Sequence, residues 1–268
     1  MDRRVIISAD DFGLSLAVND AVEQAHRNGI LTTASLMVAG DAAADAVRRA
    51  RAMPGLKVGL HAVVIEGASV LRSPHLTDAN GWFPSGQLRL GVRYALDGPA
   101  RRALRREIAA QYAAFAATGL RLDHVNAHKH MHLHPVVGAM LIAEGAGYGL
   151  RAIRIPSEPG SVLRACGERP GVGAAALERW TALLRWQARR AGLQTNDHVF
   201  GIAWSGQMTQ ARVLRLLPHL PLGTSEIYFH PATYADPTLQ RLMPGYQHAA
   251  ELQTLLSPAV RAAIDALT

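Results

Sequence analysis

Residues 5–13 read Val-Ile-Ile-Ser-Ala-Asp-Asp-Phe-Gly, and this stretch decides between the fold classes open to the chain. Its first five residues form a short apolar, β-branched run, which is typical of a buried strand. Two carboxylates, Asp10 and Asp11, follow at the point where a dinucleotide- or phosphate-binding protein would carry a glycine-rich loop. The stretch therefore indicates a buried strand that delivers acidic side chains, and it disfavours a nucleotide-binding fold.

Six further segments of this kind follow, and helical patterns separate them. They lie at residues 32–38, 57–64, 120–127, 151–155, 199–204 and 225–230. Such alternation indicates a parallel sheet, and no linker rich in proline, glycine or serine interrupts it. We therefore predict an α/β protein with a single domain over residues 1–268, folded as a TIM-barrel-like (β/α) barrel that is distorted or seven-stranded.

Two regions have a distinct pattern. Residues 65–98 carry Gly, Pro, Asn and Trp without clear periodicity, which indicates a long loop or lid inserted in the domain. Residues 174–190 predict a basic amphipathic helix that contains Trp180 and Trp186. Such a helix suits the surface of an anionic membrane. The alternative is that it packs its tryptophans on the barrel and leaves its arginines in water.

The composition sets limits on function. Of the 268 residues 49% are hydrophobic and 18% are charged, so the chain can bury a sizeable core. The net charge of +7 favours an acidic partner, anionic lipid or nucleic acid; solvated arginine-rich helices are the simpler interpretation, and we expect no nucleic-acid partner. The single cysteine, Cys166, excludes an intrachain disulfide.

The chain shows neither a signal-peptide pattern nor an apolar run of membrane-spanning length. We therefore expect a cytoplasmic protein, and we leave open peripheral contact with a membrane and a homodimer.

The run Asp123-His124-Val125-Asn126-Ala127-His128-Lys129-His130-Met131-His132-Leu133-His134-Pro135 holds five of the 12 histidines. On an extended backbone alternate side chains share a face, so His128, His130 and His132 are expected to point the same way. Imidazole is a good ligand for zinc and other transition metals. Three histidines at this spacing do not usually close a tetrahedral site, so the remaining ligands should come from elsewhere in the chain.

The carboxyl ends of the expected strands supply candidates, because catalytic side chains of β/α barrels collect there. These ends carry Asp10, Asp11, His61, His128, His130, His132, Arg154, Glu226 and His230. Two carboxylates and several histidines are therefore expected to meet at one rim. One aspartate with two histidines would leave coordination positions open, as a hydrolytic metal site requires.

Four motifs spread over nearly the whole chain carry a family resemblance. They are Val-Ile-Ile-Ser-Ala-Asp-Asp-Phe-Gly-Leu-Ser at 5–15, Val-Gly-Leu-His at 58–61, His-Val-Asn-Ala-His-Lys-His-Met-His at 124–132 and Glu-Ile-Tyr-Phe-His-Pro at 226–231. Together they resemble the YdjC/ChbG-type carbohydrate deacetylases. Residues 195–206 and the form Val-Asn-Ala-His-Lys-His are most similar to the HpnK branch, which is associated with hopanoid biosynthesis. Asn126 stands where other members often carry aspartate, so one contact around the site is expected to differ.

The resemblance implies a metal-dependent hydrolase that removes the N-acetyl group from an N-acetylglucosamine-containing substrate on a NodB/YdjC-like fold. Asp11, His61 and His128 would hold one divalent ion, Mg²⁺ or Zn²⁺, and Asp10 would be the catalytic base. The HpnK likeness implies that the substrate is a glycolipid, an acetylglucosaminyl hopanoid linked through bacteriohopanetetrol. Chito-oligosaccharides or other amino sugars are the alternative substrates.

Other candidates fill supporting roles. We assign the protonation of the leaving amine to His230, from its place after the last strand, with His130 or His132 as the alternative. His130 and His132 otherwise contact the metal ligands or the substrate, or serve packing.

Arg154 is expected to orient Asp10, and Glu226 to pair with Arg154; a surface or packing role for Arg154 is the alternative. Two other classes of function stay open. One is a metal hydrolase of different specificity, such as a phosphoesterase. The other is a non-catalytic protein that binds sugar or nucleic acid through its basic surface.

Overall fold

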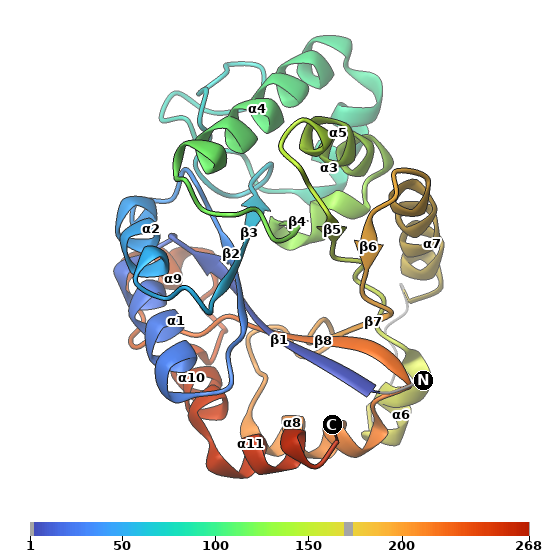
Figure 1. Cartoon of the computed structure of the whole chain (residues 1–268). Coiled ribbons are helices and arrows are strands. Elements are labelled where there is room, and N and C mark those ends of the chain that lie inside the picture. The colour runs from blue at the N-terminus through green and yellow to red at the C-terminus, as the bar shows by residue number, and fades with distance from the viewer. Residues whose placement is uncertain (1–2, 169–173, 268) are drawn as a thin grey trace.

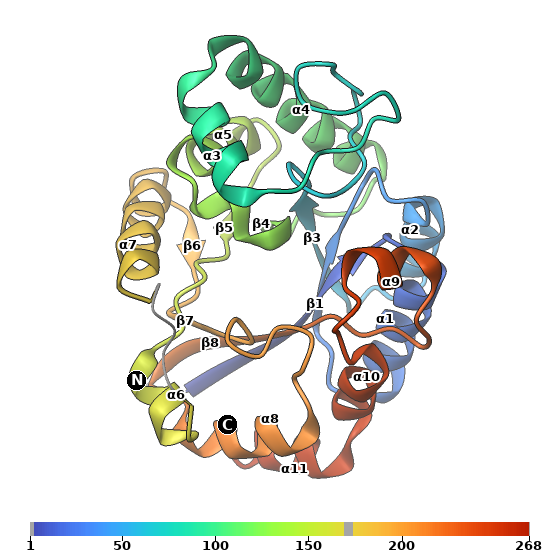
Figure 2. The ribbon, with the colours of Figure 1, turned by 180° about the vertical axis from the view of Figure 1, so that it is seen from behind.

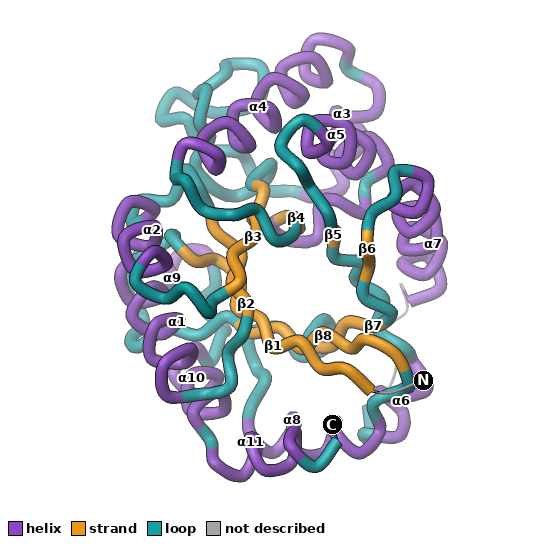
Figure 3. Tube along the Cα trace, viewed as in Figure 1, coloured by secondary structure: helices purple, strands orange, loops and turns teal. Residues whose placement is uncertain are grey.

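The computed structural model describes residues 3–168 and 174–267, and at its centre eight parallel strands curl into a partial barrel (Figures 1 and 3). The strands are β1 Arg3–Phe12, β2 Thr33–Leu36, β3 Lys57–Ala62, β4 Val125–Ala127, β5 Ala152–Ile153, β6 Gln194–Thr195, β7 His198–Phe200 and β8 Gly223–Phe229. Their order is β6-β5-β4-β3-β2-β1-β8-β7, and each neighbouring pair is parallel. The predicted α/β class and barrel-like architecture are therefore confirmed.

Helices cover the outside of the curled sheet (Figure 2). They are α1 Leu16–Asn28, α2 Ala43–Arg51, α3 Gln87–Leu96, α4 Gly98–Ala117, α5 Pro135–Ala146, α6 Gly160–Ala165, α7 Ala174–Arg190, α8 Gln210–Leu216, α9 Pro237–Leu242, α10 His248–Leu256 and α11 Pro258–Asp265, with the short 3₁₀ helices η1 His128–Leu133 and η2 Leu217–His219. No helix in the described ranges is long and apolar enough to cross a bilayer. Because the strands run in one direction, their carboxyl ends meet at one rim.

Apolar stripes pack the helices against the sheet. The helix α1 begins after Ser15, whose Oγ accepts a hydrogen bond from the backbone N–H of Val18. It buries Ala17, Val18, Ala21, Val22 and Ala25. The helix α4 buries an equivalent stripe that includes Leu104, Ile108, Tyr112 and Phe115. The core between helices and sheet thus follows the 3.6-residue period of the sequence.

The strand predicted at residues 199–204 has different bounds, and the seven predicted strands become eight. Its extended segment begins earlier and is divided into β6, which pairs with β5, and β7, which pairs with β8. Asn196 lies at the interruption: its Oδ1 accepts a hydrogen bond from Ile155 N at 2.7 Å, and its Nδ2 donates to Ile155 O at 2.8 Å. A side-chain amide thus takes the place of a strand neighbour, and one stretch of chain joins the two edges of the sheet.

The histidine run is not extended, so the expectation that alternate histidines share a face is wrong. The strand β4 covers only Val125–Ala127, and the chain then turns into η1. Lys129 and His130 adopt left-handed backbone conformations, with φ of 50° and 54°. This turn directs the histidine side chains to different neighbours, because the two-residue period of a strand no longer applies.

Residues 65–98 are not irregular throughout, as their lack of periodicity predicted. The helix α3 forms at 87–96, where Leu90 and Tyr94 are buried one turn apart. The loop before α3 is fastened to α4, because the buried carboxylate of Glu107 accepts hydrogen bonds from two consecutive backbone N–H groups of the loop, at 2.8 and 2.9 Å. A role of this region as a lid stays a prediction.

Candidate metal centre and active site

A pocket of about 120 Å³ lies at the carboxyl ends of the strands. It is lined by Asp10, Ala127, His128, Lys129, His130, Ile202, Ser205, Tyr228, His230, Met243 and Tyr246. These residues come from β1, from the end of β4 and the turn after it, from the segment after β7, from the end of β8 and from the segment between α9 and α10. The rim that sequence reasoning selected is thus where the structure gathers its polar side chains.

Three of the predicted residues form a compact cluster beside this pocket. One ligand atom from each of Asp11, His61 and His128 lies within 4.8 Å of the other two, and all three side chains are buried. Asp11 Oδ1 is 3.1 Å from His128 Nδ1 and 3.3 Å from His61 Nε2. The cluster combines one carboxylate with two imidazoles, a donor set that suits a divalent ion such as Zn²⁺.

Asp11 itself shows that the cluster fits a cation. Neither of its carboxylate oxygens has a hydrogen-bond partner of acceptable geometry among the described residues, although both are buried. Burial raises the pKa of Asp11, but His128 and His61 outweigh it and hold the pKa well below its usual range. An ionised carboxylate without hydrogen bonds is costly to bury, and a cation between the three side chains would remove that cost.

A β-bulge explains how two consecutive aspartates reach the same site. Consecutive side chains of a regular strand point to opposite faces. The pairing of β1 with β2 shifts by one residue between Ala9 and Phe12, and Asp11 has a left-handed backbone with φ of 64°. The extra residue re-aims the chain, as bulges next to active sites do. Gly13 follows with φ of 93°, where a Cβ would come within 2.9 Å of Met37 O.

The orientation of the His61 ring is fixed by Asn126. His61 Nδ1 lies 2.7 Å from Asn126 Oδ1, so this nitrogen carries the proton and Nε2 is left free to bind a metal. The Nδ2 of Asn126 donates to Asp10 Oδ1 at 3.2 Å and to Ser35 Oγ at 3.0 Å. Asn126 therefore connects the cluster of Asp11, His61 and His128 to the second aspartate.

Asp10 lies in a different environment from Asp11, because Arg154 binds both of its oxygens. Arg154 Nη1 donates to Asp10 Oδ2 at 2.6 Å, and Nη2 donates to Oδ1 at 2.9 Å. Burial raises the pKa of Asp10, but the charge and hydrogen bonds of Arg154 outweigh it, so the pKa lies well below its usual range. Asp10 is therefore ionised near neutral pH.

Arg154 is held in turn by Glu226 on β8, which pairs with Ile6, four residues before Asp10 on β1. Arg154 Nη2 and Nε donate to Glu226 Oε1 at 2.6 and 3.0 Å, and Ser8 Oγ donates to the same oxygen at 2.6 Å. The guanidinium is buried between two carboxylates, which raise its pKa against the effect of burial. The predicted contacts of Arg154 with Asp10 and of Glu226 with Arg154 are both present.

The remaining histidines of the run separate into two positions. His130 Nε2 lies 3.1 Å from the hydroxyl of Tyr228, and burial, followed by the charge of Arg154, lowers the pKa of His130 to about 3. His132 is buried, and its Nδ1 accepts a hydrogen bond from the backbone N–H of Ala127 at 3.1 Å. His130 thus faces the pocket, whereas His132 stabilises the turn after β4.

His230 lines the pocket between two aromatic rings, 5.4 Å from Tyr228 and 5.0 Å from Tyr246 between ring centroids. Burial lowers its pKa to about 4, although the charges of Asp11 and Asp10 act in the opposite direction. Its imidazole is therefore neutral near pH 7. A general acid at this position has to gain its proton as negative charge develops in the pocket.

Sequence reasoning missed several residues of the pocket. Tyr228 is the clearest, because it lies on β8 between Glu226 and His230, and a two-residue period places all three on one face. Its ring also lies 5.0 Å from the Arg154 guanidinium. The two-residue period of the last strand was therefore the sequence signal that could have identified Tyr228. Tyr246 and Ser205, which hydrogen bond to each other at 2.8 Å, come from irregular segments without such a signal.

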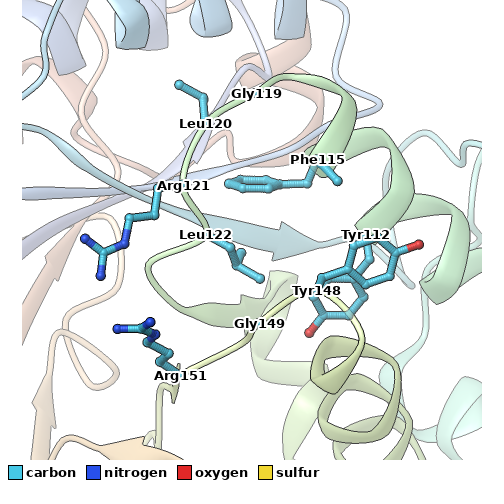
Figure 4. A pocket seen from close by; sticks show the side chains of 10 residues that line it. Tyr112, Phe115, Gly119, Leu120, Arg121, Leu122, Tyr148, Gly149 and Arg151 are labelled. Atoms are coloured by element: carbon cyan, nitrogen blue, oxygen red, sulfur yellow. The ribbon is translucent and has the colours of Figure 1, made fainter.

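A second pocket, of about 410 Å³, lies at the amino ends of β4 and β5 (Figure 4). Tyr112 and Tyr148 stack at one end with ring centroids 5.4 Å apart, and Arg121 and Arg151 lie at the other. Its lining contains neither carboxylate nor imidazole. It therefore lacks the groups for acid–base or metal chemistry, and the smaller pocket is the candidate active site.

The fold and this site define a barrel-like α/β protein with a buried Asp-His-His cluster at its catalytic rim. A sequence model of the YdjC-like protein family matches residues 4–266, and the chain belongs to this family. It is 31% identical over 261 residues to a carbohydrate deacetylase of Geobacillus stearothermophilus, which covers 97% of this chain and 92% of that protein. A carbohydrate deacetylase of Brevibacillus brevis is 39% identical over 135 residues, about half of each chain (50% and 52%).

A solved structure supports the fold. A protein of Enterococcus faecalis V583, described as a cellobiose-phosphate cleavage protein, superposes with a TM-score of 0.74 at 22% identity, over 99% of this chain and 95% of that one. At this level of identity the likeness concerns the fold alone. It confirms that the curled parallel sheet and its helices are shared with an experimentally determined structure.

Proposed function

We propose that this protein is a metal-dependent hydrolase that removes the N-acetyl group from an amino sugar. The observation that carries the proposal is the convergence of Asp11, His61 and His128 beside a second carboxylate, Asp10, that Arg154 keeps ionised. A cation site next to a fixed base is the arrangement that hydrolysis of an unactivated amide requires. The relatives that carry the name carbohydrate deacetylase support the same chemistry.

Asp11, His61 and His128 would hold the ion, which would polarise the acetamido carbonyl and make a water molecule more acidic. Two imidazoles and one carboxylate suit Zn²⁺ better than Mg²⁺, which prefers oxygen ligands. Asn126 keeps the His61 proton on Nδ1, so that Nε2 is directed at the ion. The metal dependence and the identity of the ion both belong to the proposal.

Asp10 takes the proton of the attacking water on a carboxylate oxygen that faces the pocket. Arg154 fixes the direction of this carboxylate through two hydrogen bonds, and Glu226 fixes Arg154. The low pKa of Asp10 makes it a weak base, so it depends on a water molecule that has already become more acidic. His230, which follows the adjacent strand β8, takes up a proton as negative charge develops in the pocket and delivers it to the leaving nitrogen.

For the substrate we propose an acetylglucosaminyl hopanoid, with chito-oligosaccharides as the alternative. The residues that carry the HpnK likeness, 195–206, run into the pocket, since Ile202 and Ser205 line it. A lipid-linked substrate also implies peripheral contact with an anionic membrane, which the net charge of +7 favours. A cytoplasmic location and a homodimer are further parts of the proposal that rest on the sequence alone.

The test is acetate release by the metal-loaded protein, measured with Zn²⁺ and with Mg²⁺. The substrates are an N-acetylglucosaminyl lipid, chito-oligosaccharides and phosphate esters. We expect acetate from the amino sugars, no phosphate from the esters, and loss of activity with a chelator that returns when the ion is added back. A protein that binds no divalent ion, or that hydrolyses only the phosphate esters, would contradict the proposal.

A further inference from the structure

A large groove lies between α6 and α7, next to the active-site pocket. It has a volume of about 880 Å³, and its apolar lining includes Leu163, Leu177, Ala182, Trp186, Ile202 and Ala203. The helices α6 and α7 lie on either side of β7 in both ribbon views (Figures 1 and 2). Trp186 is 53% exposed and lines this groove, and the Arg190 guanidinium lies 5.0 Å from the centre of its ring.

The groove and the active-site pocket share a wall. Ile202 lines both of them, so the two spaces are adjacent on either side of this side chain. The wall is held by Glu158, whose carboxylate accepts hydrogen bonds from the backbone N–H groups of Gly201, Ile202 and Ala203 at 2.9, 3.1 and 2.8 Å. Hydrogen bonds from three consecutive residues to one partly buried carboxylate fix the segment between the two spaces.

Two charged side chains of the groove already bind backbone groups of the protein. Glu158 is engaged by the wall, and Arg185 donates through Nη1 to the backbone carbonyl of Asn196 at 2.8 Å and through Nη2 to that of Asp197 at 2.9 Å. Neither of these two charges is therefore free to bind a sugar hydroxyl or an anion, and the other two charged residues of the lining, Glu178 and Arg189, lie at exposed positions of α7. The contact of Arg185 with Asn196 and Asp197 also anchors α7 to the segment that joins β6 and β7.

We propose that this groove binds the apolar aglycone of the amino-sugar substrate while the acetamido group occupies the active-site pocket. The inference rests on the proposed deacetylase function and on its lipid-linked substrate, and it adds the place where the hydrocarbon of that substrate binds. The exposed Trp186 forms one wall for the hydrocarbon, and Ile202 lies at the passage between sugar and aglycone. The free energy comes from removing the hydrocarbon and this lining from water.

The test compares the binding of methyl and octyl N-acetylglucosaminide to the Zn²⁺-loaded protein by calorimetry, below the micelle concentration of the octyl compound. We expect the octyl glycoside to bind at least about tenfold more tightly, since each buried methylene contributes favourably. Trp186→Ala and the groove-filling Ala182→Arg, both at exposed positions of α7, should remove most of this preference. Trp180→Ala is the matched control: Trp180 lies on the same helix, is 45% exposed and does not line the groove.

The outcomes separate the groove from the chemistry. Equal affinity for the two glycosides, or an equal loss of preference in Trp180→Ala and Trp186→Ala, overturns the groove assignment even if acetate is released. A loss of affinity for chito-oligosaccharide in Trp186→Ala also overturns it, since the groove would then hold sugar. Preferential octyl binding that disappears only in the groove variants supports the assignment, and acetate release measured on the same samples reports separately on the deacetylase proposal.

Discussion

Asp10 and Asp11 are neighbours in the chain, equally buried, and opposite in their surroundings. Asp10 receives hydrogen bonds on both oxygens from Arg154 and on one of them from Asn126. Asp11 has none of acceptable geometry from the described residues, and its nearest polar neighbours are the imidazoles of His61 and His128. The difference shows that identical side chains acquire separate roles from their partners. Asp10, whose charge is already balanced by Arg154, needs no metal ion, whereas the buried charge of Asp11 needs a cation to balance it.

The largest effect is expected from Asp11→Asn. This change removes the charged ligand and should abolish binding of the divalent ion, so kcat/KM for acetate release should fall by at least about 10³-fold. Metal content of the purified variant and acetate release measure the two effects. Retention of both stoichiometric metal and activity would show that the cluster of Asp11, His61 and His128 is not the cation site.

Asp10→Asn should lower kcat by about 10²- to 10⁴-fold while the metal content stays that of the wild type. The amide keeps the size of the side chain but cannot take a proton from water. Parallel metal analysis of the Asp10 and Asp11 variants tests the division of roles directly. If Asp10→Asn lost the ion instead, Asp10 would be a ligand rather than a base.

Arg154→Ala should lower the free energy of unfolding by about 3–5 kcal/mol, because it leaves two buried carboxylates, Asp10 and Glu226, without their cation. Thermal denaturation measures this loss. The milder Arg154→Lys keeps the charge but cannot bridge both carboxylates, so the pKa of Asp10 should rise toward its ordinary value. The acidic limb of the pH profile of kcat/KM should then move to higher pH, and an unchanged limb would contradict the proposed pairing.

The metal-free protein should be stabilised by the ion itself. At a free concentration about 100 times Kd, binding contributes about 2.7 kcal/mol, which corresponds to a rise in Tm of about 5–10 °C. The same addition should leave the Tm of Asp11→Asn unchanged and should raise that of Asp10→Asn as in the wild type. A rise of equal size in the Asp11 variant would place the ion elsewhere in the protein.

The smallest effect is expected from Asn126→Asp, which alters the link between the two aspartates. The carboxylate can still accept the proton of His61 Nδ1, but it loses the hydrogen bond that Asn126 Nδ2 donates to Asp10. Two adjacent negative charges raise the pKa of Asp10, so activity at low pH should fall by less than about tenfold while the metal content is unchanged. Ser35→Ala, which removes the other acceptor of this amide, is the control for packing.

The sequence carried enough information for the architecture. The alternation of apolar runs with helical stripes predicts a parallel sheet, and the rule that strand ends share a rim predicts that Asp11, His61 and His128 converge despite their separation in the chain. Period two along β8 would also have identified Tyr228. These features follow from local patterns that repeat along the chain, so they can be derived without knowing the tertiary contacts.

Other features depend on long-range contacts and were not predictable. The bulge at Asp10 and Asp11 is defined by the pairing of β1 with β2. The turn at Lys129 and His130 depends on left-handed backbone conformations, which neither residue type predicts. The division of the penultimate strand depends on Asn196 finding the backbone of Ile155. In each case the local sequence is compatible with a regular strand, and contacts with a distant segment impose a different backbone conformation.

The segment that joins β6 and β7 has a consequence for association between molecules. An open strand at the edge of a sheet invites a strand of another chain to pair with it, which leads to aggregation or to dimers with a continuous sheet. Here the two edge strands have only two and three residues, and they follow one another along a single stretch of chain. So few unpaired backbone groups make a poor template for a foreign strand. Self-association of this protein is therefore expected to proceed through its helical exterior.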